Sequence, residues 1–590
     1  MQKFKNILAD CIKRELDSMS PENGYTTEDI AAMLEYPPDK SMGDVAFPCF
    51  KLSKLLRKAP PAIAQAFLEP VAKLSVVAKA EVAGGYLNIF ANGKYFTSDV
   101  INRILTEGDR YGSNDSGKGK TMVIDYSSPN VAKPFHIGHL GTTVIGHSLK
   151  MLYKFCGWNT IGINHLGDWG TQFGKLIVAY RKWGSKEQVE KGGIDELVSL
   201  YVRINKAIKE EEEQSIKGLS ESEAVGKKHS ELGDEARHEF KKLEDGDEEN
   251  RALWKWFISI SIEEYKKTYK QLGIEFDHYT GESFYTDLMP AQVQKLRDKN
   301  LLKTDDGASI VDLSAYNMPP CLILKRDGST LYPTRDIAAA VYRKETYHFD
   351  KCIYVTSNQQ ILHFAQWFKV LELMGYDWYN ELLHVPYGTV SINGAKLSTR
   401  DGNVILLRDL FKMAIDKSRE IIEERNPSLE NKDEVAEAVG VGAIVFNYLS
   451  NSRIKDINFN LEDALSFDGN TGPYAQYTYA RCCSLIEKSG IDAPSVPENY
   501  EANEAELQLL KTLSAFSERV EAAIKSSEPM EITRFILDVC SDFNRFYHDC
   551  QIISAEDKST KDFRIALTYA TRTALGNAFG LICLKKTQRI

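Results

Sequence analysis

The sequence lacks a long run of hydrophobic residues. No apolar stretch approaches the roughly 18 residues that a membrane-spanning helix needs. The chain begins with MQKFKNILADCIKREL, an amphipathic helix pattern that includes an Asp and a Glu. Secretory leaders have an unbroken apolar centre, and transit peptides are poor in acidic residues. The sequence therefore predicts a cytoplasmic protein that makes no contact with a membrane.

Metal-binding and disulfide patterns are missing as well. No C-x-x-C or H-E-x-x-H string occurs, and the ten cysteines are scattered, with only Cys482 and Cys483 adjacent. Scattered cysteines are typical of reduced thiols in protein cores rather than of a disulfide framework. We therefore predict no zinc, no protein-bound metal site and no organic cofactor.

Positive charge is in the minority. The 73 Lys and Arg residues against 83 Asp and Glu residues give a formal net charge of −10. This balance argues against wholesale coating of nucleic acid, although it is compatible with a local basic groove. The hydrophobic share of 43% and the charged share of 26% are ordinary for a globular protein.

The 590 residues divide into four predicted parts. Residues 1–112 have the pattern of a small α/β domain, followed by a polar, glycine-rich linker. Residues 113–408 form an α/β core with a highly charged helical insertion at about 186–272, to which we assign no catalysis because a charge run is usually a solvated helix face. Apolar residues at three- and four-residue spacing then predict a helical connector at 409–466 and an all-helical bundle at 467–590.

The stretch at residues 121–140, TMVIDYSSPNVAKPFHIGHL, combines a strand pattern, a proline-bounded loop and a pair of histidines. The apolar run at 140–155 predicts a helix that begins just after His139. A helix start favours anions, and Gly138 between His136 and His139 would let a ligand approach the backbone. Two imidazoles there could donate hydrogen bonds to a nucleotide phosphate. There are two alternatives: the histidines could be buried in a core with their hydrogen bonds made inside the protein, or they could form half of a metal site.

This stretch resembles the HIGH signature of class I aminoacyl-tRNA synthetases. The string Asp125-x-Ser127-Ser128-Pro129-Asn130-x-x-Lys133 is similar to the arginyl-tRNA synthetase version of it. HLGDWGTQFG at 165–174 is also similar to that family, as are PPDKSMGDVAFPCFKLSK and GGYLNIF near the N-terminus, in a domain that touches the tRNA elbow in the family. The resemblance implies a Rossmann-like catalytic core with a helical insertion, flanked by an α/β N-terminal domain and an all-α anticodon-binding bundle.

A second block, Thr330 to Ala340, points to the amino-acid substrate. Asp336 lies one helical turn beyond Tyr332, so a helix that begins near Pro333 would let both side chains converge on one ligand. The carboxylate of Asp336 could pair with the planar fork of a guanidinium. The plainer interpretation is that Asp336 is an acid at a helix start, where the helix dipole favours negative charge. The resemblance implies that Tyr332, Asp336 and Gln360 bind the arginine side chain. It also implies that the backbone end of arginine is bound by Asp125, Ser127 and Asn130.

A lysine loop follows at residues 396–403, KLSTRDGN. On its own an exposed lysine flanked by glycine is usually a solvated turn. It resembles the KMSKS signature of class I synthetases, but Thr399 stands where the second lysine is expected. In the arginyl family Lys133 is thought to supply that charge, and Arg400 is the alternative second cation. The resemblance implies that ATP is bound by His136, Gly138, His139, Lys396 and Ser398. It implies catalysis by His136, His139, Lys133 and Lys396.

The helical C-terminal third resembles the anticodon-binding domain of the same family through GNTGPYAQY at 469–477. Tyr474 and Gln476 are its candidate tRNA contacts. The implied activity is ATP-dependent ligation of L-arginine to its tRNA through an arginyl-adenylate, with Mg²⁺ accompanying ATP and the enzyme acting as a monomer. Another class I synthetase, a small-molecule nucleotidyltransferase of the HxGH type, and a catalytically silent tRNA-binding protein are the alternatives.

Overall fold

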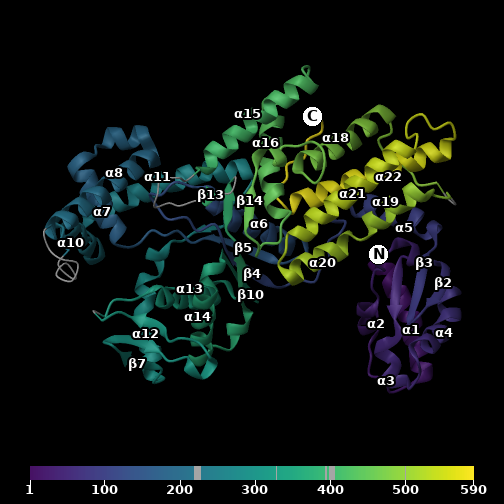
Figure 1. The fold of residues 1–590 in the computed structure, drawn as a ribbon, viewed down its shortest axis with the longest axis horizontal. Coiled ribbons are helices and arrows are strands. Elements are labelled where there is room, and N and C mark those ends of the chain that lie inside the picture. Colours follow the sequence, from purple (N-terminus) through teal and green to yellow (C-terminus); the bar gives the residue numbers. More distant parts are fainter. Residues whose placement is uncertain (218–227, 327, 393–394, 397–404, 498–499) are drawn as a thin grey trace. The chain divides into compact units, whose positions relative to one another are not determined.

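The computed structural model describes residues 1–217, 228–326, 328–392, 395–396, 405–497 and 500–590 (Figure 1). The chain forms two compact units, each described here by itself. The terminal unit comprises Met1–Asn114, Phe467–Leu581 and Lys585–Ile590, and the central unit comprises Asp115–Ser466 and Ile582–Leu584. No helix within the described ranges is long and apolar enough to span a membrane. The finer division into four domains stays a prediction.

A five-stranded parallel sheet is the centre of the central unit. Its spatial order is β11-β10-β4-β5-β6, and all four strand pairs are parallel. The strands are β4 (Thr121–Asp125), β5 (Asn159–Asn164), β6 (His278–Tyr279), β10 (Lys351–Ser357) and β11 (Leu382–Tyr387). The chain starts in the middle at β4, proceeds to one side and returns to the other at β10. Ligands of such sheets bind beyond the carboxyl ends of the strands where the order reverses.

The predicted Rossmann-like core and the strand and helix of the 121–140 stretch are confirmed. β4 is buried along most of its length, as its β-branched and apolar residues require. α6 (Leu140–Phe155) follows, preceded by a single turn of 3₁₀ helix, η4 (Ile137–His139). A Cβ atom added at Gly146 would lie 2.3 Å from Cβ of Tyr126, so α6 packs closely against the sheet on the side to which Tyr126 points.

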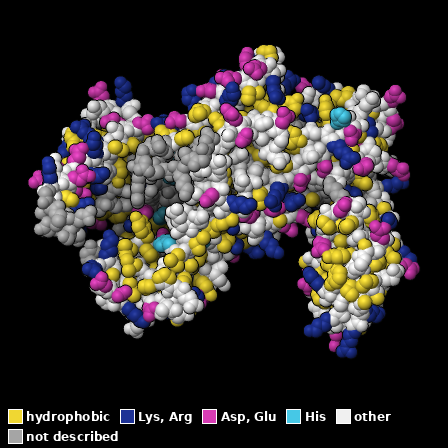
Figure 2. All heavy atoms as spheres, viewed as in Figure 1, with side chains coloured by type: hydrophobic (Ala, Val, Ile, Leu, Met, Phe, Trp, Pro, Cys, Tyr) yellow, Lys and Arg dark blue, Asp and Glu magenta, His cyan; other side chains and the backbone are white. Residues whose placement is uncertain are grey.

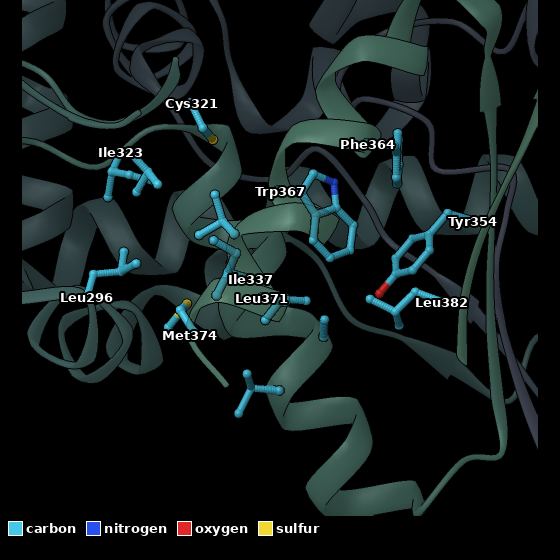
Figure 3. Packing of buried hydrophobic residues seen from close by; sticks show 14 of the residues in the cluster. Leu296, Cys321, Ile323, Ile337, Tyr354, Phe364, Trp367, Leu371, Met374 and Leu382 are labelled. Atoms are coloured by element: carbon cyan, nitrogen blue, oxygen red, sulfur yellow. The ribbon is translucent and has the colours of Figure 1, made fainter. Parts of the chain in front are cut away.

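The other face of the sheet carries the main hydrophobic core. Because side chains alternate along a strand, Val123 and Tyr354 point to the face opposite Tyr126. They pack there with α13 (Tyr332–Tyr347) and α14 (Ile361–Leu373). Figure 3 shows Trp367 beside Tyr354 and Phe364, with Ile337 and Leu371 between the helices. This packing fixes the first turns of α13 and α14 beside the carboxyl edge of the sheet.

Two small sheets complete this part of the central unit. The antiparallel order β7-β8-β9 consists of β7 (Leu302–Asp305), β8 (Ala308–Val311) and β9 (Cys321–Leu324), which lead into α13 after α12 (Met289–Asp298). In the order β13-β12-β14, β12 (Val390–Ile392) pairs antiparallel with β13 (Ala395–Lys396) and parallel with β14 (Ile457–Phe459).

The described part of the predicted insertion consists of helices joined by short turns. α7 (Thr171–Trp183) leads into α8 (Lys186–Ser215), α10 (Glu231–Asp245) and α11 (Glu248–Leu272). The helices α15 (Leu407–Arg425) and α16 (Lys432–Leu449) of the predicted connector also belong to the central unit, where α16 contacts α6. The insertion returns to the sheet through α11, which ends shortly before β6.

The terminal unit joins an antiparallel sheet to a helical bundle. The sheet order is β1-β3-β2, with β1 (Val45–Pro48), β2 (Val77–Ala83) and β3 (Tyr86–Ala91). Its N-terminal helices are α1 (Gln2–Met19), α2 (Thr27–Met33), α3 (Ser53–Leu56), α4 (Pro60–Ala72) and α5 (Gly93–Glu107). The C-terminal helices are α18 (Gly472–Ser489), α19 (Glu504–Ser514), α20 (Phe516–Ser526), α21 (Met530–Asp549) and α22 (Lys558–Gly580).

The sequence has apolar residues at helical spacing from 504 to 525, which predicts one helix, but the structure divides this segment into two. α19 ends at Ser514 and α20 begins at Phe516. The carbonyl oxygen of Ser514 accepts a hydrogen bond from the N-terminal ammonium of Met1 at 2.5 Å. That carbonyl is engaged by a partner outside the helix, at the boundary between α19 and α20. The helical period of the sequence carries no sign of this distant partner.

Candidate functional site

The two histidines of the signature are oriented by backbone N–H groups. The Nδ1 atom of His136 accepts from the Gly138 N–H at 3.1 Å, and Nδ1 of His139 accepts from the His136 N–H at 3.2 Å. A neutral imidazole that accepts at Nδ1 carries its proton on Nε2. The ring centroids lie 3.9 Å apart. The site therefore presents two Nε2–H donors side by side at the start of α6.

Both histidines are held neutral. Burial lowers the pKa of His136 to about 4, and the nearby charge of Lys133 lowers it further. Burial also lowers the pKa of His139 to about 3, with His136 adding to the effect. The pair can thus donate hydrogen bonds at neutral pH without bringing a charge. A Cβ atom at Gly138 would lie 2.8 Å from the His136 ring, so this glycine makes room for the imidazole itself.

The loop between β4 and η4 has an uncommon backbone. Ser127, Ser128 and Ala132 have φ values of 72°, 45° and 57°. Such left-handed conformations in residues other than glycine cost on the order of 1 kcal/mol or more each and persist only where the surroundings impose them. The Val131 N–H donates to the Gly167 carbonyl at 3.1 Å, which joins this loop to the HLGDWG segment after β5.

Ser127 is the centre of this loop and is only 2% exposed. Its hydroxyl lies 2.8 Å from Oγ1 of Thr143 and 2.7 Å from the Tyr269 hydroxyl, and its N–H donates to Oγ1 of Thr142 at 3.0 Å. The predicted contact of Ser127 with arginine therefore does not fit its side chain, because the hydroxyl is already engaged inside the protein.

Asp125 also has an internal partner that the sequence did not indicate. Its Oδ2 lies 2.8 Å from a guanidinium nitrogen of Arg343, and its Oδ1 accepts from the Ser128 hydroxyl at 2.9 Å. Arg343 is only 1% exposed, and its guanidinium lies 5.4 Å from the ring centroid of Tyr354. The predicted contact of Asp125 with the backbone end of arginine does not fit this carboxylate, since its charge neutralises a buried arginine.

Asn130 is exposed and lies at the same edge. It forms a bridge with Gly167, where an added Cβ atom would lie 2.1 Å from the Asn130 side-chain oxygen. The close approach that glycine permits thus sets the position of the Asn130 amide. This placement is compatible with the predicted contact to the backbone end of arginine.

The predicted side-chain pocket gathers two acids, each with an internal cation or imidazole. As predicted, α13 begins at Tyr332, which is 66% exposed. Asp336, one turn further, has its Oδ2 atom 2.6 Å from Nε2 of His363 in α14. The Glu282 carboxylate, at the start of η5 (Glu282–Leu288), lies 2.7 Å from the guanidinium of Arg335. Sequence reasoning missed both His363 and Arg335.

The remaining predicted arginine contact, Gln360, lies at the end of η7 (Asn358–Gln360) and is exposed. It follows β10 directly, so it occupies the same edge as Asp125 and Asn130. Figure 2 shows hydrophobic side chains gathered over the region of α13 and α14, with histidine atoms at their border. Exposed members near this edge include Tyr332, Ile361 and Leu362.

The segment after the lysine loop contacts the segment that carries the histidines. Lys396 ends the short strand β13, and its side chain, like Ser398, lies outside the described residues. After the loop, the Leu407 N–H donates to the Phe135 carbonyl at 2.9 Å, and the Ile137 N–H donates to the Ile405 carbonyl at 3.3 Å. The backbone thus brings the segment after the second signature against the first.

The predicted tRNA contacts in α18 lie on opposite sides of the helix. The Tyr474 hydroxyl accepts from the Asn544 amide at 2.8 Å. Gln476 has no exposed surface, and its amide donates to the Lys585 carbonyl at 3.0 Å, so the predicted direct tRNA contact is wrong for this residue. Arg481, further along α18, lies 4.9 Å from the ring centroid of Tyr477 and 4.6 Å from that of Tyr547.

Comparison with known protein families identifies the class of protein to which this fold and site belong. Residues 100–461 match the family model of the tRNA synthetases class I (R), catalytic domain. Residues 475–590 match the DALR anticodon binding domain, and residues 6–91 the arginyl tRNA synthetase N terminal domain. The parallel sheet with its histidine signature is thus that of a class I aminoacyl-tRNA synthetase.

Similar proteins cover the whole chain. An arginine–tRNA ligase of Clostridioides difficile is 49% identical and one of Alkaliphilus metalliredigens 47%, each over 100% of both chains. The arginyl-tRNA synthetase structure from Thermus thermophilus has the same fold, with a TM-score of 0.82 at 22% identity over 99% of this chain and 100% of that one. The chain belongs to the arginyl-tRNA synthetase family.

Proposed function

We propose that the protein ligates L-arginine to its tRNA in two steps, through an arginyl-adenylate, with release of pyrophosphate and AMP. The observation that carries this proposal is the meeting of two kinds of group at one sheet edge. Two neutral Nε2–H donors follow β4, and the carboxylates of Glu282 and Asp336 lie beside the same strands. The first pair suits a phosphate and the second suits a guanidinium.

The histidines would act on the nucleotide. As the arginine carboxylate attacks the α-phosphate of ATP, negative charge grows on the phosphate oxygens, and donors that are already oriented stabilise it. His136 and His139 supply such donors. Lys133 is exposed, and its charge reaches both imidazoles. Lys133 and Lys396 would supply positive charge, and Mg²⁺ would enter as part of the ATP substrate.

The amino acid would be held at its two ends by different elements. Tyr332, Asp336 and Gln360 would bind the guanidinium end, joined by Glu282, whose carboxylate must exchange Arg335 for the substrate. Asn130 would bind the backbone end. Among the described residues no group of three His, Cys, Asp or Glu is arranged to hold a metal ion, so we assign no metal ligand.

Arginine binding is expected to weaken as the pH falls through 7. Burial raises the pKa of Glu282 to about 7, while Arg335 opposes the shift and Asp168 and Asp336 add to it. Above this pH the carboxylate attracts a guanidinium, and below it the neutral acid does not. The KM for arginine should therefore rise about tenfold from pH 8 to pH 6, since one unit below a pKa about a tenth of a carboxyl remains ionised.

Glu282→Gln is the matched control for this profile. It should show a high arginine KM that no longer changes between pH 6 and pH 8. A parent enzyme with a pH-independent KM would contradict the assignment of Glu282.

The bundle would recognise tRNA through stacking. Arg481 lies between the rings of Tyr477 and Tyr547, of which 37% and 44% of the surface is exposed. Unpaired bases stack on aromatic rings and guanidinium planes, at about 1–3 kcal/mol per base. We expect Arg481→Ala to raise the KM for tRNA about tenfold and to leave the KM for ATP unchanged.

Arg534→Ala is the control for that measurement, because Arg534 is an exposed arginine of the neighbouring helix α21. Aminoacylation kinetics with varied tRNA measure both variants. Equal tRNA KM values for the two would rule out the stacking site.

ATP–pyrophosphate exchange tests the function as a whole. The proposal expects exchange that depends on arginine, and family resemblance suggests that it depends on tRNA as well. Exchange without arginine would favour a small-molecule nucleotidyltransferase, and exchange driven by another amino acid would favour a different class I synthetase. No exchange and no charging, with tRNA still bound, would mark a silent tRNA-binding protein.

The monomeric state and the cytoplasmic location stay predictions. Sedimentation of the purified protein with and without tRNA would measure the first. A dimer that persists at low protein concentration would contradict it.

A further inference from the structure

One face of α11 lies against the loop that carries the histidine signature. Ser261, Tyr265 and Tyr269 are spaced four residues apart and therefore share this face. All three are buried. The helix ends the insertion that the sequence marked only as a charged, solvated segment, so the proposed function leaves these residues without a role.

Each of the three hydroxyls contacts a residue of the loop. Oγ of Ser261 accepts from the Ala132 N–H at 3.1 Å. The Tyr265 hydroxyl shares its proton between the carbonyls of Asn130 at 2.8 Å and Lys133 at 2.9 Å. Tyr269 lies 2.7 Å from the hydroxyl of Ser127. Two of these contacts fall on Ser127 and Ala132, which have left-handed backbones.

Tyr269 is part of a hydrogen-bond chain that ends at His139. Oγ1 of Thr143 donates to the His139 carbonyl at 2.6 Å, so Thr143 must accept from the Ser127 hydroxyl and Ser127 from Tyr269. The Asn164 amide donates to Tyr269 at 2.8 Å. Every hydroxyl in the chain then donates once. Burial raises the pKa of Tyr269 well above its ordinary value, which keeps this phenol protonated.

The tyrosine rings reach the same histidine through Phe135. The Phe135 ring centroid is 5.6 Å from those of Tyr265 and Tyr269. On its other side Phe135 stacks on His139, with centroids 5.0 Å apart and planes 7° apart. The plane of the His139 imidazole is therefore supported by a ring that α11 supports in turn.

The same helix also contacts the segment after the second signature. Glu264, one residue before Tyr265, lies 3.5 Å from the guanidinium of Arg408. One guanidinium nitrogen of Arg408 also lies 2.9 Å from each carboxylate oxygen of Asp195 in α8. Arg408 directly follows Leu407, whose N–H donates to Phe135. The first signature loop and the segment that follows the second signature thus both contact α11.

We propose that Tyr265 and Tyr269 are positioning residues for adenylate formation, and that α11 sets the geometry of loop 127–133 and of the His139 imidazole. This inference rests on the proposed function. The tyrosines lie behind the loop and would touch no substrate. Their hydroxyls fix backbone carbonyls and Ser127, and through them the groups that face ATP.

Removal of the hydroxyls alone tests this role. Tyr265→Phe/Tyr269→Phe keeps both rings against Phe135 and deletes the hydrogen bonds. We expect kcat of arginine-dependent ATP–pyrophosphate exchange, per active site, to fall at least fivefold. The fall in kcat should exceed any rise in the KM for arginine, because Asp336 and Glu282 lie on other elements and only Asn130 lies in the loop that the hydroxyls hold. Active sites are counted by the burst of enzyme-bound adenylate.

Tyr180→Phe is the matched control. Tyr180 of α7 packs its ring against Phe257 of α11 at 5.7 Å between centroids, away from the loop. It should keep the parent kcat. Thermal unfolding of the parent, the double variant and Tyr180→Phe distinguishes an altered site geometry from a loss of folded enzyme.

The results divide clearly. A fall in kcat per active site of less than fivefold in the double variant overturns the inference, as does a fall of the same size in Tyr180→Phe. A loss that lies wholly in the number of active sites also overturns it, since it would indicate a purely structural role. Absence of arginine-dependent exchange in the parent would instead refute the proposed function.

Discussion

Asp336→Asn is expected to raise the KM for arginine about 100-fold or more while leaving weak inhibition by citrulline almost unchanged. The carboxylate lies at the first turns of α13 and has one oxygen on His363, and its charge would pair with the guanidinium. Loss of one partner from a desolvated charge pair costs about 2–5 kcal/mol. Citrulline has no charge to lose. Discrimination between the two ligands should therefore collapse.

The matched control is Glu345→Gln, which removes an exposed acid from the same helix. Its arginine KM should equal that of the parent. If Asp336→Asn weakened arginine and citrulline equally, Asp336 would have a structural role and not a role in charge recognition.

His139→Ala is expected to lower kcat of adenylate formation about 10²- to 10³-fold, the typical loss of one transition-state donor. The KM values for ATP and arginine should change little, because the donor acts on charge that appears during the reaction. Burial lowers the pKa of His139 to about 3, so its protonation contributes no pH dependence to kcat between pH 6 and pH 8.

His229→Ala serves as the control, since this exposed histidine lies in the insertion. Single-turnover formation of adenylate measures the chemical step. Turnover at the parent rate in His139→Ala would exclude the donor role.

Local patterns predicted the framework of the site well. The strand pattern within 121–140 and the predicted helix at 140–155 correspond to β4 and α6, and α13 begins one residue before Pro333, near which its start was predicted. These features depend on residues only a few positions apart. The spacing of apolar residues, the prolines and the residues typical of helix starts are therefore sufficient to predict them.

Partners distant in sequence were beyond such patterns. Asp125 and Ser127 matched a family string, yet their charge and hydroxyl are taken by Arg343 and Tyr269, which come from α13 and α11. Nothing local marks Arg343 as buried. The spacing of Tyr265 and Tyr269 was a usable signal, because apolar or aromatic residues four apart on a charged helix indicate a buried face.

The misassignment of Gln476 has a simpler cause. Residues two apart on an α-helix point in nearly opposite directions, so Tyr474 and Gln476 could not both face a ligand once α18 was recognised. Tyr477 and Arg481, four apart, share the exposed side. The helical period would have selected them over Gln476.

The two hydrogen bonds from backbone N–H groups to the histidines also disfavour the binding of a metal ion by these imidazoles. Zinc binds an imidazole through a nitrogen lone pair. In His136 and His139 the lone pair of Nδ1 is occupied by a backbone N–H, and Nε2 holds the proton. A divalent ion could bind only after one of these bonds broke. Adjacent histidines that would otherwise attract zinc would thereby stay available for the proposed contact with phosphate.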